Sequence, residues 1–147
     1  MGKIKIILID DHQMFRDGVK SVLCDEKNIN VIGEVGTGKD LYQMLKSKQP
    51  DLIITDISMP DISGIEITKY VSENYPVIKI LILSMHSNEE FITKALGAGA
   101  NGYLPKDTSM DELLRAINTI YIGENYFNKK ISDTILKSII KKSKEET

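Results

Sequence analysis

The sequence contains no tryptophan and only one cysteine, Cys24. A single cysteine excludes an internal disulfide, and this fits a reducing compartment, so we expect a cytoplasmic protein. Cys24 lies in an apolar stretch, which predicts a buried side chain with a packing role. No apolar run approaches the roughly 20 residues that a membrane-spanning helix needs, and no signal peptide precedes the first apolar segment. We therefore expect no membrane partner.

The charges are also unevenly distributed. Residues 1–127 hold 13 Lys and Arg against 18 Asp and Glu, whereas residues 128–147 hold 6 against 3. The body is mildly acidic and is not expected to bind nucleic acid by itself. With 147 residues, 41% apolar and 27% charged, the composition is that of one ordinary globular domain with a short appendage.

Strand-like and helix-like segments alternate five times along the chain. The predicted strands are Ile4–Ile9, Asn30–Val35, Leu52–Asp56, Lys79–Leu83 and Gly102–Leu104. The predicted helices are Gln13–Cys24, Lys39–Lys48, Gly64–Tyr75, Glu89–Ala98 and Met110–Tyr121. This rhythm predicts an α/β fold, a doubly wound five-stranded parallel sheet with helices on both faces. Pro105 ends the fifth strand and predicts that this strand is an edge of the sheet.

The alternation stops after Gly123. Asn125–Asn128 is predicted to be a connection, and a sixth helix follows with an apolar stripe flanked by lysines. An isolated helix of this length is marginal in water, so the stripe needs a partner. We expect protein contact, and membrane-surface binding by the basic flanks is the alternative.

Acidic residues follow two of the predicted strands directly. Asp10 and Asp11 come after the first strand, and Asp56 ends the third. In an open parallel sheet, ligands bind beyond the carboxyl ends of the strands, so these acids are expected to share one pocket. Neighbouring carboxylates repel one another unless a cation is present, and Mg²⁺ suits such a site.

The fourth and fifth strands lead to groups that bind anions. Ser84 follows the fourth strand with a hydroxyl donor, and Lys106 follows the fifth with an ammonium. Acids for a metal beside a hydroxyl and an ammonium for an anion favour phosphoryl transfer, in which positioning and charge neutralisation supply most of the catalysis.

With these residues in view, the chain resembles the receiver domains of two-component response regulators. The matching segments lie between residue 3 and about residue 122. They are Asp10-Asp11, Asp56, Met59-Pro60-Asp61-x-x-Gly64, Ser84 and Gly102-Tyr103-Leu104-Pro105-Lys106. The resemblance implies a flavodoxin-like sheet of order 2-1-3-4-5.

The resemblance also implies the role of each residue. Asp56 would accept a phosphoryl group from a sensor histidine kinase. Mg²⁺ would be held by Asp11, Asp56 and the backbone carbonyl of Ser58, with Asp10 acting through water. Ser84 and Lys106 would bind the phosphoryl oxygens, and Tyr103 would be the aromatic that turns inward on activation. Such a domain catalyses only its own phosphorylation and dephosphorylation, and dimerises when phosphorylated.

Two further segments indicate a subfamily. Ser84-Met85-His86 and Tyr103-Leu104-Pro105-Lys106-Asp107 resemble regulators with a LuxR-type helix-turn-helix output domain. Residues 1–124 would then be the receiver and residues 125–147 a linker helix. DNA would be bound only through an output domain outside this sequence.

Two other functions stay open. A stand-alone receiver of the chemotaxis type would act by protein contact alone, and it would need no basic sixth helix. A hydrolase of the haloacid-dehalogenase type would carry an acid two residues after the nucleophile, where this chain has Ser58.

Two motifs are judged not to be ligand sites. Gly33–Asp40 almost fits a phosphate-binding P-loop, but Asp40 stands where Ser or Thr should hold Mg²⁺, so we expect a structural turn. His12 and His86 have no Cys or His at ligand spacing, which argues against zinc, and His86 is expected at the rim of the pocket.

Overall fold

The computed structural model describes residues 2–145, so Met1 and the last two residues of the predicted linker lie outside it. The described strands are β1 (Ile4–Ile9), β2 (Ile29–Val35), β3 (Leu52–Thr55), β4 (Lys79–Ser84), β5 (Gly102–Pro105) and β6 (Tyr126–Phe127). The helices are α1 (Gln13–Cys24), α2 (Gly38–Leu45), α3 (Gly64–Asn74), α4 (Glu89–Gly97), α5 (Met110–Tyr121) and α6 (Lys129–Glu145).

The strands form one parallel sheet in the order β2-β1-β3-β4-β5-β6. The predicted order 2-1-3-4-5 is confirmed, but the prediction that the fifth strand is an edge is wrong. The segment predicted to be a simple connection contains β6, which pairs with Gly102 and Tyr103 of β5. This short strand ends before it reaches Pro105, so the missing N–H of that proline disturbs no pairing with β6.

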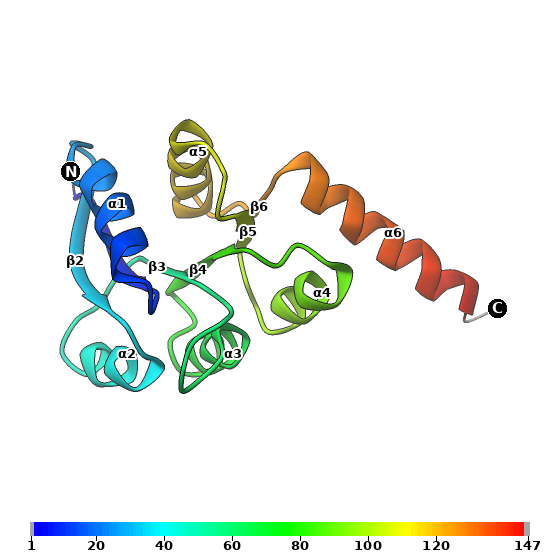
Figure 1. The fold of residues 1–147 in the computed structure, drawn as a ribbon, viewed down its shortest axis with the longest axis horizontal. Coiled ribbons are helices and arrows are strands. Elements are labelled where there is room, and N and C mark those ends of the chain that lie inside the picture. The colour runs from blue at the N-terminus through cyan, green and yellow to red at the C-terminus, as the bar shows by residue number, and fades with distance from the viewer. Residues whose placement is uncertain (1, 146–147) are drawn as a thin grey trace.

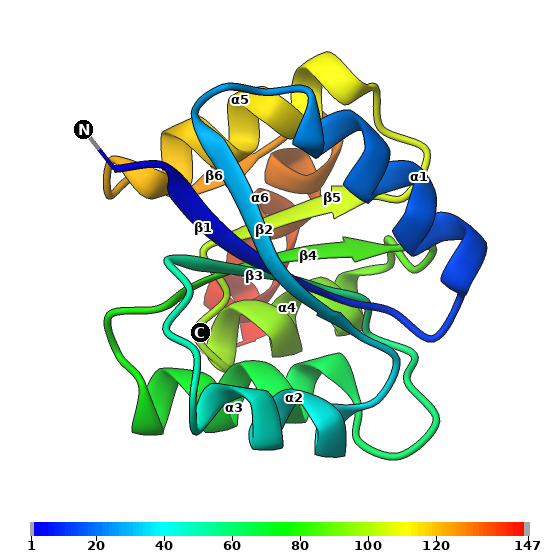
Figure 2. The same ribbon diagram turned by 90° about the vertical axis from the view of Figure 1, so that its left-hand side faces the viewer.

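Helices cover both faces of the sheet, with α1 and α5 on one face and α2, α3 and α4 on the other (Figures 1 and 2). The central strands β3 and β4 are buried on both sides, as their continuous apolar runs predict, whereas the outer strands β2 and β6 are mostly half-buried. In β1, for example, Ile7 and Ile9 belong to the core beneath α2, α3 and α4, whereas Ile6 and Leu8 belong to the core beneath α1 and α5. The two cores hold β1 and β3 rigidly, and these strands carry the acidic residues at their ends.

The prediction that Cys24 is buried is wrong. Cys24 is the last residue of α1 and its side chain is exposed. The buried residues of this helix are Val19 and Leu23, four positions apart on one face. The next residue along the helix is rotated away from that face by about 100° and faces solvent.

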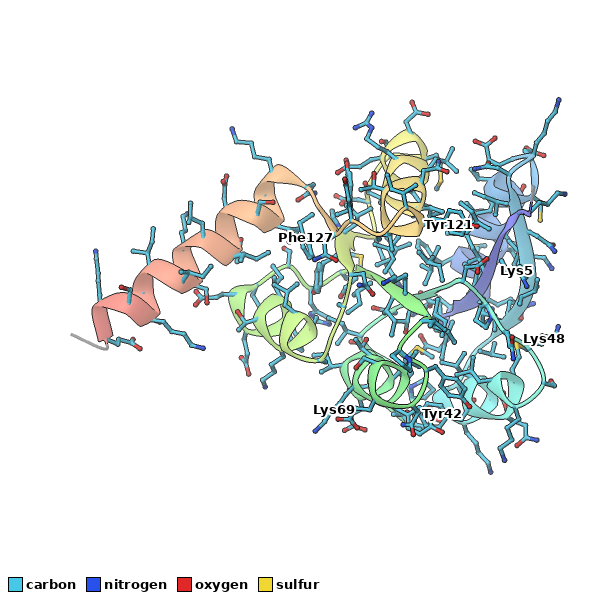
Figure 3. All side chains as sticks on the ribbon, turned by 180° about the vertical axis from the view of Figure 1, so that it is seen from behind. Lys5, Tyr42, Lys48, Lys69, Tyr121 and Phe127 are labelled. Carbon is cyan, nitrogen blue, oxygen red and sulfur yellow. The ribbon has the colours of Figure 1, made fainter. Side chains whose placement is uncertain are left out.

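Helix α6 leaves the edge of the sheet and runs alongside α4, with its second half projecting beyond the body (Figure 1). Ile131 near its start is fully buried, and Ile135 packs on the same core. Phe127 also packs there, at the point where the chain passes from the sheet to α6 (Figure 3). Leu136, Ile139 and Ile140 remain exposed. Within residues 2–145 there is no helix both long and apolar enough to cross a bilayer.

Candidate functional site

The carboxylates predicted to meet do meet at one edge of the sheet. Asp10 follows β1 and Asp56 follows the adjacent strand β3. Both are only 4% exposed, whereas Asp11 is exposed. Strands β1 and β3 lie where the order of the sheet reverses, which is the position where open α/β sheets bind their ligands.

Lys106 lies between the two buried acids. Its Nζ is 2.7 Å from Oδ2 of Asp10 and 2.9 Å from Oδ2 of Asp56, and it also lies 4.6 Å from the centre of the Phe15 ring. Burial alone would lower the pKa of Lys106, but the hydrogen bonds and charges of Asp10 and Asp56 outweigh it and raise the pKa above its ordinary value. The ammonium is therefore charged at neutral pH, and it is the counter-ion of both carboxylates.

The turn after β3 fixes the orientation of Asp56. Its Oδ1 accepts a hydrogen bond from the backbone N–H of Ile57 at 2.7 Å, and the hydroxyl of Thr55 donates to its carbonyl oxygen at 2.9 Å. Gly64, the first residue of α3, lies directly against this peptide. A Cβ at position 64 would be 1.9 Å from the carbonyl oxygen of Asp56, so only glycine fits.

A group of four side chains forms a candidate metal site. Asp10, Asp11, Asp56 and His12 each offer one ligand atom, and these atoms all lie within 4.8 Å of one another. The three carboxylates carry a charge of −3, of which Lys106 compensates one. A divalent cation would neutralise the remainder, and carboxylate oxygens are the ligands that hard divalent cations prefer. The donor set therefore fits the predicted metal.

Ser84, His86 and Tyr103 form a second part of the site. Ser84 is fully buried, and its hydroxyl oxygen accepts a hydrogen bond from the backbone N–H of His86 at 3.0 Å. The hydroxyl of Tyr103 donates to the backbone carbonyl of the same histidine. The His86 ring lies 4.7 Å from the Phe91 ring at the start of α4, and its Nε2 is 3.0 Å from Oγ of Ser58.

Tyr103 occupies an inward position, with no exposed surface. Burial raises the pKa of its phenol to about 12, so the hydroxyl keeps its proton and remains a donor at neutral pH. The β4–α4 turn is thus held at two consecutive peptide groups, because Ser84 accepts from the N–H of His86 and Tyr103 donates to the carbonyl of the same residue.

The segment Gly33–Asp40, which almost fits a P-loop, binds a carboxylate of the chain itself. The backbone N–H groups of Gly38 and Lys39 at the start of α2 both donate to the carboxylate of Asp61, at 2.9 Å each. These bonds lower the pKa of Asp61 below its ordinary value. The helix N-terminus that a phosphate would need is occupied by a carboxylate of the chain itself, as expected for a structural turn.

Two neighbours of the site were not predicted, His12 and Phe15. His12 directly follows Asp11, and this adjacency was the available signal. Phe15 is placed over Lys106 by the first turn of α1, and no motif marks it.

Comparison with known proteins identifies the class. Residues 6–118 match the family model of the response regulator receiver domain, and the chain belongs to this family. It is 37% identical over 136 residues to the transcriptional regulatory protein DegU of Brevibacillus brevis, covering 92% of this chain and 58% of DegU. The chain thus spans less than two thirds of the length of this longer relative.

Similar solved structures also belong to response regulators. A LuxR-family two-component response regulator from Aurantimonas sp. SI85-9A1 has a TM-score of 0.88 at 29% identity, covering 95% of this chain and 99% of that one. RcsB from Salmonella enterica serovar Typhimurium, bound to promoter P1flhDC in the presence of the phosphomimetic BeF3-, has a TM-score of 0.85 at 25% identity, covering 92% and 68%. The predicted receiver fold and its LuxR-type relationship are confirmed.

Proposed function

We propose that Asp56 is the phosphoacceptor of this receiver and that a sensor histidine kinase supplies the phosphoryl group. The observation that carries the proposal is the Lys106 ammonium, 2.9 Å from Asp56 and 2.7 Å from Asp10. It places a fixed cation beside the carboxylate that has to receive a negatively charged group.

The acids beside Asp56 fit Mg²⁺ as the cation. Asp11 and Asp56 would bind it together with the backbone carbonyl of Ser58, and Asp10 would act through water. When bound, Mg²⁺ supplies neutralising charge to the carboxylates and to the incoming phosphoryl oxygens. Asp56 forms the new bond to phosphorus while the bond from phosphorus to the donor nitrogen breaks. Lys106 then pairs with a phosphoryl oxygen.

Ser84 and Tyr103 would carry the signal away from Asp56. The Ser84 oxygen accepts a bond from His86, and its own hydrogen, which reaches Tyr103 in this structure, would turn to a phosphoryl oxygen when one is present. If Ser84 moves toward that oxygen, it pulls on the N–H of His86, while Tyr103 is bound to the carbonyl of the same residue. A local change in charge thereby shifts the β4–α4 turn between two positions.

The finer organisation is also part of the proposal. Residues 1–124 form the receiver and residues 125–147 a linker helix to a DNA-binding output domain outside this sequence. The relative DegU is longer, and RcsB was bound to DNA in the presence of a phosphomimetic. These relatives and the presence of α6 favour a transcription regulator that dimerises on phosphorylation over a stand-alone chemotaxis-type receiver.

We regard the domain as catalysing only its own phosphorylation and dephosphorylation. A haloacid-dehalogenase-type hydrolase would need an acid at position 58. There the structure has Ser58, whose hydroxyl lies 3.0 Å from the His86 ring. A hydroxyl in this position does not supply the general acid and base that repeated hydrolysis requires.

The experiment is phosphorylation by a small phosphodonor with Mg²⁺, followed by intact-protein mass spectrometry. The wild type and Asp51→Asn should gain one phosphoryl group, because Asp51 lies at the opposite end of β3. Asp56→Asn should gain none, and Asp11→Ala or EDTA should abolish labelling. If Asp56→Asn is labelled at the wild-type rate, another residue is the acceptor. Full labelling in EDTA would refute the metal site.

A further inference from the structure

The His12 imidazole reaches into the acidic cluster, where its Nδ1 lies at hydrogen-bond distance from two carboxylate oxygens. Its Nδ1 lies 3.1 Å from Oδ1 of Asp11 and 3.2 Å from Oδ1 of Asp10. His12 occupies the N-cap position of α1, yet its side chain makes no capping hydrogen bond there. The side chain is 67% exposed, so core packing does not hold it in place either.

These separations match those between neighbouring ligands of one metal ion. Ligand atoms about 2.1 Å from a metal lie roughly 3 Å apart when adjacent and roughly 4 Å apart when opposite in an octahedral sphere. The imidazole nitrogen lies at the adjacent-ligand separation from two carboxylate oxygens. The whole group, with Asp56, lies within 4.8 Å, so its outermost atoms would draw closer together around one ion.

The second oxygens of the buried acids are already engaged. Lys106 contacts Oδ2 of Asp10 and Oδ2 of Asp56. The Oδ1 atoms each accept one backbone hydrogen bond, from His12 at 2.8 Å and from Ile57 at 2.7 Å, and each keeps a lone pair for a metal on the side where His12 lies. A cation there would face carboxylate oxygens and one imidazole nitrogen, a mixed set rather than an all-oxygen set.

We propose that His12 is a direct nitrogen ligand of the metal in this receiver, and that it shifts the preference of the site from Mg²⁺ toward first-row transition metals such as Mn²⁺ and Co²⁺. Imidazole binds these ions well, whereas Mg²⁺ prefers oxygen. The inference rests on the proposed metal site and adds to it a ligand and a class of metal. Removing His12 should weaken Mn²⁺ and Co²⁺ binding and leave Mg²⁺ binding nearly unchanged.

Calorimetric titration of the metal-free chain with Mg²⁺, Mn²⁺ and Co²⁺ tests the preference. In His12→Ala the affinities for Mn²⁺ and Co²⁺ should fall by about tenfold or more, while that for Mg²⁺ should change by less than about threefold. Met14→Ala is the matched control, because Met14 lies on the same helix turn and is 89% exposed. This variant should bind all three ions as the wild type does.

Pulsed electron paramagnetic resonance of the Mn²⁺ complex tests the ligand directly. The chain has two histidines, so a nitrogen coupling from a bound imidazole can arise only from His12 or His86. The coupling should persist in His86→Ala and vanish in His12→Ala. Tight Mg²⁺ binding with unchanged metal ratios in His12→Ala, or a coupling that survives in it, would overturn the nitrogen ligand and leave the proposed function intact. A wild type that binds none of the three ions would overturn both.

Discussion

Gly64→Ala is a small substitution with a large expected effect on the site. The added Cβ would lie 1.9 Å from the carbonyl oxygen of Asp56 and 2.8 Å from Cα of Ile57. Both atoms belong to the backbone, so no side-chain rotation relieves the contact. Since real Cβ contacts stay above 3.0 Å, the two segments must separate by at least 1.1 Å.

A displacement of this size is comparable to the displacement at which the hydrogen bonds of Asp56 are lost. Asp56 is held by Lys106 at 2.9 Å and by the Ile57 N–H at 2.7 Å, and both contacts are lost if the carboxylate moves by 1 Å. Misplacement of a reacting group by about 1 Å can cost about 100-fold in rate. We therefore expect Gly64→Ala to be phosphorylated about 100-fold more slowly than the wild type. Overpacking should also destabilise the fold by about 1–3 kcal/mol.

The control is Gly18→Ala, in the interior of α1. A Cβ at position 18 would meet no heavy atom within 4 Å, and the backbone there has an ordinary negative φ. Replacing an exposed helical glycine by alanine should stabilise the protein by roughly 1 kcal/mol and leave phosphorylation unchanged. The same chemical change is thus expected to lower the stability at position 64 and to raise it at position 18.

The assay measures both quantities on each variant, the labelling rate with a small phosphodonor and the urea midpoint of unfolding. Wild-type labelling by Gly64→Ala would refute the argument that close packing of this residue positions Asp56. Equal slowing in Gly18→Ala would show that loss of glycine itself, rather than the collision, is responsible.

Three further outcomes follow from the geometry. The pKa of the Tyr103 phenol is raised to about 12 in the folded protein, from an ordinary value of 10.0, so its contribution to stability is complete below pH 10 and is lost as the pH rises through 12. A phenolate absorbance step near pH 12 should therefore be missing in Tyr103→Phe. An unchanged titration would mean that this hydroxyl is not buried in solution. The pKa of Lys106 is also raised, so its contribution to stability is complete below its ordinary pKa of 10.5 and is lost above it. Above that pH, the free energy of unfolding should fall less steeply in Lys106→Met than in the wild type. Parallel curves would contradict the pairing of Lys106 with the two acids. Ile131→Ala should weaken the packing of α6 on the body by about 2–5 kcal/mol and speed amide exchange along that helix. Leu136→Ala should do neither, because Leu136 is 56% exposed. Equal exchange in the two variants would mean that Ile131 does not anchor α6.

The sequence predicts the sheet and the acidic pocket well because these depend on local patterns. A buried strand ends where its apolar run ends, and the residue after it stands at the sheet edge whatever the details of packing. Asp10, Asp56 and Lys106 could therefore be expected in one place. That Lys106 bridges both acids through their Oδ2 atoms is a tertiary fact, fixed by how β5 is placed beside β4.

The features that the sequence did not predict depend on tertiary structure rather than on local patterns. Tyr126 and Phe127 form a strand only because β5 offers a free edge, and two residues carry no periodicity of their own. Cys24 is exposed because of one step of helix rotation after Leu23. The prediction against zinc at His12 stays untested; its neighbours in space are carboxylates, which spacing to other histidines and cysteines does not reveal.

A series of contacts leads from the candidate site to α6. His86 is held by Ser84 at its backbone N–H and by Tyr103 at its backbone carbonyl, and its ring lies against Phe91 of α4. Helix α4 is the surface on which α6 packs, and Thr93 reaches Ser138 across that contact at 3.5 Å. A continuous series of contacts therefore joins the Ser84 hydroxyl to the predicted linker. Contacts alone do not transmit a signal, because an element with two positions is needed as well. In this chain the β4–α4 turn is the candidate element, since hydrogen bonds hold it from two sides that a new charge at Asp56 would pull unequally.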